Sequence, residues 1–323
     1  MSNYSIDISH SPKGFDSPQP LDKTSPQHCK VEDLEILSII NKSRFTVFLA
    51  FSDKQREAYA MKVFPNRGDS PHPGFINESR FTFLNHPNII KIHKSVASKK
   101  IFTNGTEKMA SYLLMEYASN GDFVDIIDSG KISFSDEKLI RTYFHQLISA
   151  LEYMHSKGMA HLDLKLDNML LDEHYQLKIA DFDASFVEGD ERILGRGTVN
   201  FRAPELIKTE KFKTPYACDI YSAAVILFAL RLGSLPYLEN MDLKGYKLDM
   251  LLKLDDSVYF WEAHKMIRGA PLGLDENFKA LFISMIENDP EKRATFSDIK
   301  KNKWYQGPVY TNEELKNIME DME

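Results

Sequence analysis

The hydrophobic pattern changes its period partway along the chain, and this change restricts the fold more than any other feature. From residue 31 to about 115 it favours short strands, and from about residue 122 it is helical. The sequence therefore predicts an α+β protein with a small β-rich half, a larger helical half and a ligand cleft between them. The expected strands are 47–51, 58–64, 89–93 and 112–115, and the expected helices are 74–84, 136–155, 221–232, 277–287 and 295–301.

The first 30 residues differ from the rest of the chain. They contain three Ser-Pro dipeptides, few large apolar residues and no periodicity, which predicts a disordered tail. This tail is either a passive leader or a target of proline-directed phosphorylation. No basic start is followed by an apolar run, so a secretory signal is not expected.

Composition excludes several classes of protein. A net charge of −7 gives no general attraction to nucleic acid or to an anionic membrane, and neither is expected as a partner. The most apolar stretch, 223–230, is much shorter than the roughly 20 residues that span a bilayer. Two cysteines cannot build a disulfide framework, so we expect a cytoplasmic protein, with a nuclear location left open. The sequence gives no indication of the oligomeric state.

The strongest local signal is the segment His161-Leu-Asp-Leu-Lys-Leu-Asp-Asn168. It is followed by Asp181-Phe182, by Ala203-Pro204-Glu205 and by Asp289-Pro-Glu-Lys-Arg293. On these motifs, in this order, the chain resembles the eukaryotic protein kinases of the serine/threonine type over about residues 31–306. It is most similar to the calcium/calmodulin-dependent group, although it has no EF-hand loop.

The resemblance implies a bilobal fold. An antiparallel-sheet N-lobe with its hinge would occupy 31–118, a mainly helical C-lobe 119–306, and an acidic tail 307–323. It also implies transfer of the γ-phosphate of ATP to Ser or Thr hydroxyls of protein substrates, with Mg²⁺, or Mn²⁺ in its place. Such a reaction asks the protein mainly to position two substrates and to neutralise charge.

The resemblance assigns roles residue by residue. Asp163 would accept the proton of the substrate hydroxyl, and Lys165 would steady the transferred phosphoryl group. Lys62 would contact the α and β phosphates with Glu78 as its partner. The metal ligands would be Asn168 and Asp181, which supply the hard oxygens that such ions need. The implied nucleotide contacts are Ile40, Val47, Ala60, Lys62, Met115, Glu116, Tyr117, Ala118, Asp122 and Leu170, and the implied structural residues are Ala203, Pro204, Glu205, Asp219 and Arg293, with Glu205 paired to Arg293.

The family's glycine-rich loop is missing from this chain. Its three glycine positions hold Ile40, Lys42 and Phe45. Glycine lets backbone N–H groups approach phosphate, so bulky residues should stiffen or lift this hairpin. The Lys42 charge would compensate in part.

Two further departures concern the activation segment. Asp183 replaces the glycine after Asp181-Phe182, where it either disfavours an inactive arrangement or is a solvated side chain. Leu162 replaces the arginine that docks a phosphorylated loop in the family, and Ser185 is the single hydroxyl residue between Asp183 and Thr198. Activation by loop phosphorylation is therefore not expected.

The sequence leaves two alternatives to an active protein kinase. The missing glycines and Asp183 favour a pseudokinase, which would act as a nucleotide-binding scaffold or an allosteric binding module. A kinase of small molecules or lipids is disfavoured by the activation segment through 203–205.

Partners follow from charge. Asp122 and Asp167 could pair with Arg or Lys upstream of the target residue, although exposed acids are common on any surface. The segment after Trp304 has apolar residues at helical spacing but is acidic, so calmodulin is not expected to bind it.

Overall fold

The computed structural model describes residues 19–20, 30–103, 106–130, 135–191, 197–208, 215–236, 257–268 and 272–322. These residues form two compact units. The sheet unit contains the described residues up to 130 together with 167–185. The helical unit contains 135–166 and the described residues from 186 onward. The α+β fold class is as predicted, but 119–130 and 167–185 belong with the sheet rather than with the helices.

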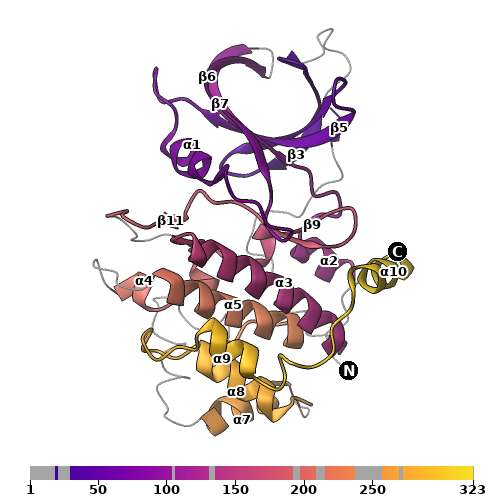
Figure 1. Ribbon diagram of the computed structural model, residues 1–323, viewed down its shortest axis with the longest axis vertical. Helices are drawn as coiled ribbons and strands as arrows, with labels where there is room; N and C mark the ends of the chain where they lie inside the picture. The colour runs from indigo at the N-terminus through magenta and orange to yellow at the C-terminus, as the bar shows by residue number, and fades with distance from the viewer. Residues whose placement is uncertain are drawn as a thin grey trace. The chain divides into compact units, whose positions relative to one another are not determined.

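The sheet unit is built on an antiparallel sheet of seven strands (Figure 1). Strand order is β1-β3-β4-β5-β7-β6, and β2 pairs with β3. A cluster of buried apolar side chains, which includes Met61 and Tyr112, forms the core of this unit. The strands are β1 (Gln19–Pro20), β2 (Lys30–Val31), β3 (Leu34–Lys42), β4 (Thr46–Ser52), β5 (Glu57–Pro65), β6 (Ile92–Thr103) and β7 (Thr106–Glu116).

Two differences from the prediction lie in this sheet. The strand expected at 89–93 begins at Ile92, and Ile89 forms an isolated bridge with Ile179. Within the expected disordered tail, Gln19–Pro20 pair with Ser38 and Ile39 of β3. The remainder of that tail up to residue 29 lies outside the described residues.

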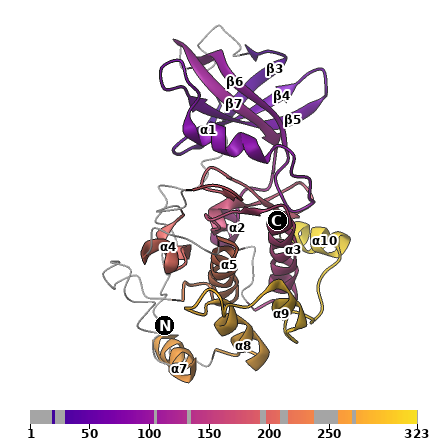
Figure 2. The same ribbon diagram turned by 60° about the vertical axis from the view of Figure 1, so that its left-hand side comes forward.

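Helix α1 (Pro73–Glu78) lies against the sheet (Figures 1 and 2). The expected helix at 74–84 is shorter than predicted, because the chain continues after Glu78 as a 3₁₀ turn, Ser79–Phe81. The His72 side chain caps the helix by accepting a hydrogen bond from Gly74 N. The sheet unit is completed by α2 (Phe123–Asp128) and by the hairpin of β9 (Met169–Leu171) with β10 (Leu177–Ile179).

The helical unit is organised around α5 (Pro215–Leu232), which packs on α3 (Glu137–Ser156) and α8 (Glu276–Met285) (Figure 2). Helix α5 is long and apolar enough to cross a membrane, but 83% of it is buried inside the protein, as in a core helix. The remaining elements are β8 (Met159–Ala160), β11 (Phe186–Val187), α4 (Glu205–Lys208), α7 (Ser257–Arg268), α9 (Phe296–Lys301) and α10 (Asn312–Asp321).

The C-terminal segment packs along α3. Leu315 and Met319 of α10 are fully buried. Tyr310 N donates a hydrogen bond to Thr142 Oγ1 at 2.8 Å. The guanidinium of Arg141 donates to the carbonyls of Trp304 and Pro308. The apolar stripe of the acidic tail therefore serves packing within the chain.

Candidate active site

Lys62 lies within hydrogen-bond distance of two carboxylates. Its Nζ is 2.6 Å from Glu78 Oε2 and 2.6 Å from Asp181 Oδ1. Lys62 comes from the centre of β5, Glu78 is the last residue of α1, and Asp181 follows β10. The pairing of Lys62 with Glu78 implied by the family resemblance is thus present.

Burial differs sharply among these three groups. The side chains of Lys62 and Glu78 are 8% and 0% exposed, whereas that of Asp181 is 38% exposed. Burial alone would lower the pKa of Lys62, but the two carboxylates outweigh it and raise that pKa, so the ammonium stays charged. Burial raises the pKa of Glu78, and the nearby Lys62 opposes that shift. One ammonium shared by two carboxylates leaves Asp181 suited to a second cation.

Asp181 and Asn168 fit the chemistry of a divalent metal such as Mg²⁺. The Asn168 carbonyl oxygen accepts a hydrogen bond from Ala180 N at 2.9 Å, which joins the two short segments that carry these side chains. Asp181 adopts a φ of +66°, in the left-handed region that non-glycine residues seldom occupy. In the described part of the chain, no group of three or more His, Cys, Asp or Glu side chains forms a metal site. Mg²⁺ commonly binds one or two protein ligands and completes its shell with phosphates and water.

The residues expected to contact the nucleotide base all lie in the sheet unit. Across the strands Ala60 pairs with Met115, and Val47 pairs with Lys62. Glu116 N donates to the carbonyl of Lys91 at 2.8 Å, so a contact of the Glu116 backbone with adenine would use its carbonyl oxygen. Ile40 lies at an irregularity of the β3–β4 pairing, Leu170 bridges to Asp122, and Tyr117 and Ala118 are half-buried.

Asp122 is buried and caps α2. Its Oδ1 accepts hydrogen bonds from Val124 N and Asp125 N at 2.8 and 3.0 Å. Burial raises the pKa of the Asp122 carboxyl to about 7; the charges of Asp125 and Asp167 add to this, and the two backbone hydrogen bonds oppose it. Since the carboxylate is committed to the helix cap, it is less suited to the substrate contact considered from sequence.

This raised pKa makes stability depend on pH. The folded state holds the Asp122 proton more tightly than the unfolded chain, so this stabilisation is complete below about pH 3.9 and is lost as pH rises through the folded pKa. Asp122→Asn keeps a good helix cap but cannot ionise. We expect its melting temperature, relative to the wild type, to rise between about pH 4 and about pH 8. Thermal unfolding of the nucleotide-free protein checks this, and a difference that is constant with pH would contradict it.

In the helical unit, hydrogen bonds hold Asp163 and the residues before it. Asp163 Oδ1 accepts hydrogen bonds from Thr198 N at 2.6 Å and from Thr198 Oγ1 at 2.8 Å. The two carboxylate oxygens of Asp219 accept from the backbone N–H groups of His161 and Leu162. The half-buried Lys165 follows two residues after Asp163. Sequence analysis did not predict the contact of Thr198 with Asp163.

Gly197 is needed at its position beside this loop. It has a φ of +89°, and a Cβ there would clash with the carbonyl oxygen of Leu162. Leu162 itself has a φ of +62° and is buried. Ser185 is fully buried as well, which supports the expectation that this segment is not activated by phosphorylation.

Asn77 is a functional candidate that sequence analysis missed. Its Nδ2 lies 3.3, 2.9 and 3.0 Å from the carbonyl oxygens of Phe182, Asp183 and Ser185. Asn77 thereby fixes the segment that follows Asp181. The signal available in the sequence was its position directly before Glu78, but the partners became visible only in the fold.

Asp183 is not the solvated side chain that was one of its two interpretations. Its side chain is 14% exposed and accepts a hydrogen bond from the guanidinium of Arg44 at 2.9 Å. Asp183 does not have a positive φ, so the backbone here does not require the family's glycine. Lys42, which was expected to compensate for the missing glycines, is exposed at the end of β3.

Glu205 and Arg293 form the expected structural pair in the helical unit. Arg293 Nη1 is 2.7 Å from Glu205 Oε1, and the Arg293 side chain is fully buried. The same guanidinium donates to the carbonyls of Ala217 and Glu287. The pair therefore joins α4 to the start of α5 and to the loop after α8.

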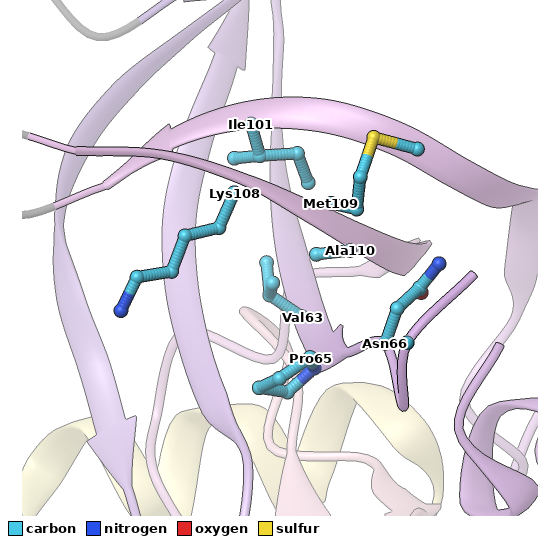
Figure 3. A pocket seen from close by; sticks show the side chains of 8 residues that line it. Val63, Pro65, Asn66, Ile101, Lys108, Met109 and Ala110 are labelled. Atoms are coloured by element: carbon cyan, nitrogen blue, oxygen red, sulfur yellow. The ribbon is translucent and has the colours of Figure 1, made fainter. Parts of the chain in front are cut away.

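A cavity of about 310 Å³ lies elsewhere in the sheet unit (Figure 3). Its lining comes from the end of β5 and the residues after it, from β6 and from the start of β7. None of the predicted site residues lines it. The lining residues are Val63, Pro65, Asn66, Gly68, Ile101, Lys108, Met109 and Ala110.

Comparison with known proteins identifies the family. The model of the protein kinase domain family matches residues 43–305. The motifs, the sheet unit with its Lys62–Glu78 pair and this match agree, so the chain belongs to the protein kinase family, as the resemblance indicated.

Curated relatives are also protein kinases by name. The chain is 30% identical over 300 residues to CBL-interacting serine/threonine-protein kinase 12 of Arabidopsis thaliana, covering 88% of this chain and 55% of the relative. It is 33% identical over 227 residues to CBL-interacting protein kinase 26 of Oryza sativa subsp. japonica, covering 69% and 41%. It is 33% identical over 228 residues to the carbon catabolite-derepressing protein kinase of Secale cereale, covering 70% and 40%. The chain spans about half the length of these relatives.

Proposed function

We propose that this chain is an ATP-dependent protein serine/threonine kinase that uses Mg²⁺, or Mn²⁺ in its place. The single observation that carries the proposal is the arrangement of Lys62 between Glu78 and Asp181, with Nζ 2.6 Å from each carboxylate. It presents one fixed cation for phosphate and one accessible carboxylate for a metal. The names of the relatives support the same activity and give no support to the pseudokinase alternative.

In this proposal each unit contributes its own groups. Asp181 and Asn168 would hold the metal ion, which would neutralise charge on the nucleotide phosphates when bound. Lys62, aimed by Glu78, would bind phosphate oxygens. Asp163, held by Thr198, would accept the proton of the substrate hydroxyl, and Lys165 would stabilise charge on the transferred group.

Transfer of labelled γ-phosphate from ATP to a generic basic protein, with and without Mg²⁺, tests this function. The wild type should transfer phosphate only with the metal, and Asp181→Asn should not, although its fold is retained. Wild-type protein that ATP stabilises against heat but that transfers no phosphate would overturn the proposal in favour of a nucleotide-binding scaffold.

We also propose that protein substrates carry Arg or Lys upstream of the target residue. Asp167 is half-buried and is the carboxylate that we assign to this contact, since the neighbouring Asp122 is committed to the cap of α2. Carboxylates pair well with guanidinium groups. A peptide library should show enrichment of basic residues for the wild type and reduced enrichment for Asp167→Asn. Equal use of neutral and basic peptides by the wild type would remove this preference.

The remaining features of the proposal concern regulation and location. The kinase would act in the cytoplasm or nucleus, without calmodulin and without phosphorylation of Ser185. The burial of Ser185 supports the last of these features, because the hydroxyl of a fully buried serine is not accessible to another kinase.

A further inference from the structure

The hairpin between β3 and β4 contains two large side chains at its turn. Lys42 pairs with Thr46 across the strands, so residues 43–45 form the turn, and it includes Arg44 and Phe45. A hairpin with glycines moves freely and is ordered by the phosphates that it covers. This hairpin is instead attached to the rest of the sheet unit by both side chains.

Phe45 attaches the turn to the start of α1. It is 6% exposed, and its ring centroid lies 4.4 Å from that of Phe64 and 5.0 Å from that of His72. A Cβ on Gly74 would approach the Phe45 ring to 3.2 Å, which shows how closely the ring packs on the helix. The ring centroid is also 5.6 Å from Lys62 Nζ. The turn is therefore held beside the phosphate-binding lysine.

Arg44 attaches the turn to the segment after Asp181. Its Nη1 donates to Asp183 Oδ2 at 2.9 Å, with the arginine 66% exposed and the aspartate 14% exposed. Asp183 is a fixed anchor, because Asn77 donates to the carbonyl oxygens of the residues around it. Asp183, which stands where the family has a glycine after Asp181-Phe182, thus contacts Arg44 of the hairpin that lacks the family's glycines.

We propose that Arg44 and Asp183 are positioning residues that hold the β3–β4 hairpin in place for ATP, so that this kinase binds nucleotide without the glycine-rich loop. The inference rests on the proposed function. A hairpin that is already fixed loses little conformational freedom when ATP binds, which favours affinity. The Arg44–Asp183 pair therefore links the hairpin that lacks the family's glycines to the residue that replaces the glycine after Phe182. Restoring the family's glycine at 183 therefore weakens ATP binding in this protein.

The affinity for a non-hydrolysable ATP analogue with Mg²⁺, measured by calorimetry, tests the pair. Arg44→Ala, Asp183→Gly and Asp183→Asn should each raise Kd about two- to fivefold, the range for a partly exposed ion pair. The double variant Arg44→Ala with Asp183→Gly should be no weaker than either single variant, because both remove the same contact. Arg56→Ala, which removes an exposed arginine from the β4–β5 turn, is the matched control and should leave Kd unchanged.

Amide hydrogen exchange of the nucleotide-free protein gives a second readout. Residues 43–45 should exchange faster in Arg44→Ala and Asp183→Gly than in the wild type or in Arg56→Ala. An unchanged or lowered Kd in Arg44→Ala, or in both Asp183 variants, would overturn the inference while ATP binding by the wild type stands. A wild type that binds no ATP would instead overturn the proposed function, and unchanged exchange would then show that the pair does not hold the hairpin either.

Discussion

Asp163→Asn is expected to lower kcat by about 10²- to 10⁴-fold, the contribution of a positioned general base. Asparagine keeps the Oδ1 that accepts the two hydrogen bonds from Thr198, so the loop should keep its geometry. The amide cannot take up the proton of the substrate hydroxyl. Because the nucleotide residues lie in the other unit, the affinity for ATP should change little.

Steady-state kinetics with a peptide substrate measure this effect, and ATP-dependent thermal stabilisation serves as the control for folding and binding. A kcat within about tenfold of the wild type would contradict the assignment of Asp163 as the base. A loss of activity together with a loss of ATP binding would indicate that the substitution damaged the structure.

Lys62→Met is expected to cost about 3 kcal/mol or more of folding free energy, as well as the binding of phosphate. The substitution leaves Glu78 fully buried and removes a cation that lies 2.6 Å away. Glu78 can respond by taking up a proton, since burial already raises its pKa, and this places the cost at the lower end of the usual range of about 3–5 kcal/mol. Urea unfolding of the nucleotide-free protein measures the change.

A matched control comes from the exposed ion pair of Lys100 and Glu107 in the same unit. These side chains are 69% and 56% exposed and 3.0 Å apart, so Lys100→Met should cost less than about 1 kcal/mol. If Lys62→Met proved as stable as Lys100→Met, the buried pair would not be formed in the protein in solution.

Sequence analysis could predict the features that depend on local pattern and on the family motifs. The helical period of 136–155 predicted α3 to within a residue at each end, and in the structure Asp136 lies just outside the helix and caps it. The pairing of Lys62 with Glu78 and of Glu205 with Arg293 followed from matched motif positions. Each of these features either is local or has counterparts throughout the family.

The features that sequence analysis missed depend on tertiary contacts between residues that have no counterpart in the family pattern. Arg44 and Asp183 are 139 positions apart in the sequence, and each by itself has the character of a surface charge. The contacts of Asn77 likewise require α1 and residues 182–185 to be packed together. Helix α1 was predicted too long because its apolar pattern continues through a 3₁₀ turn, which shares the spacing of a helix over a few residues.

The packing of α10 shows that the compact helical unit extends beyond the end of the family match. The kinase family match ends at Tyr305, yet Leu315 and Met319 of α10 are fully buried. Arg141 also donates hydrogen bonds to the carbonyl of Trp304, inside the match, and to that of Pro308, outside it. A protein trimmed to the family match would bare the apolar surface that α10 covers, and such a surface promotes aggregation. A recombinant version should therefore extend at least to residue 322, with any fusion partner placed after it, and a truncation made to isolate the kinase domain should aggregate more readily than the longer chain.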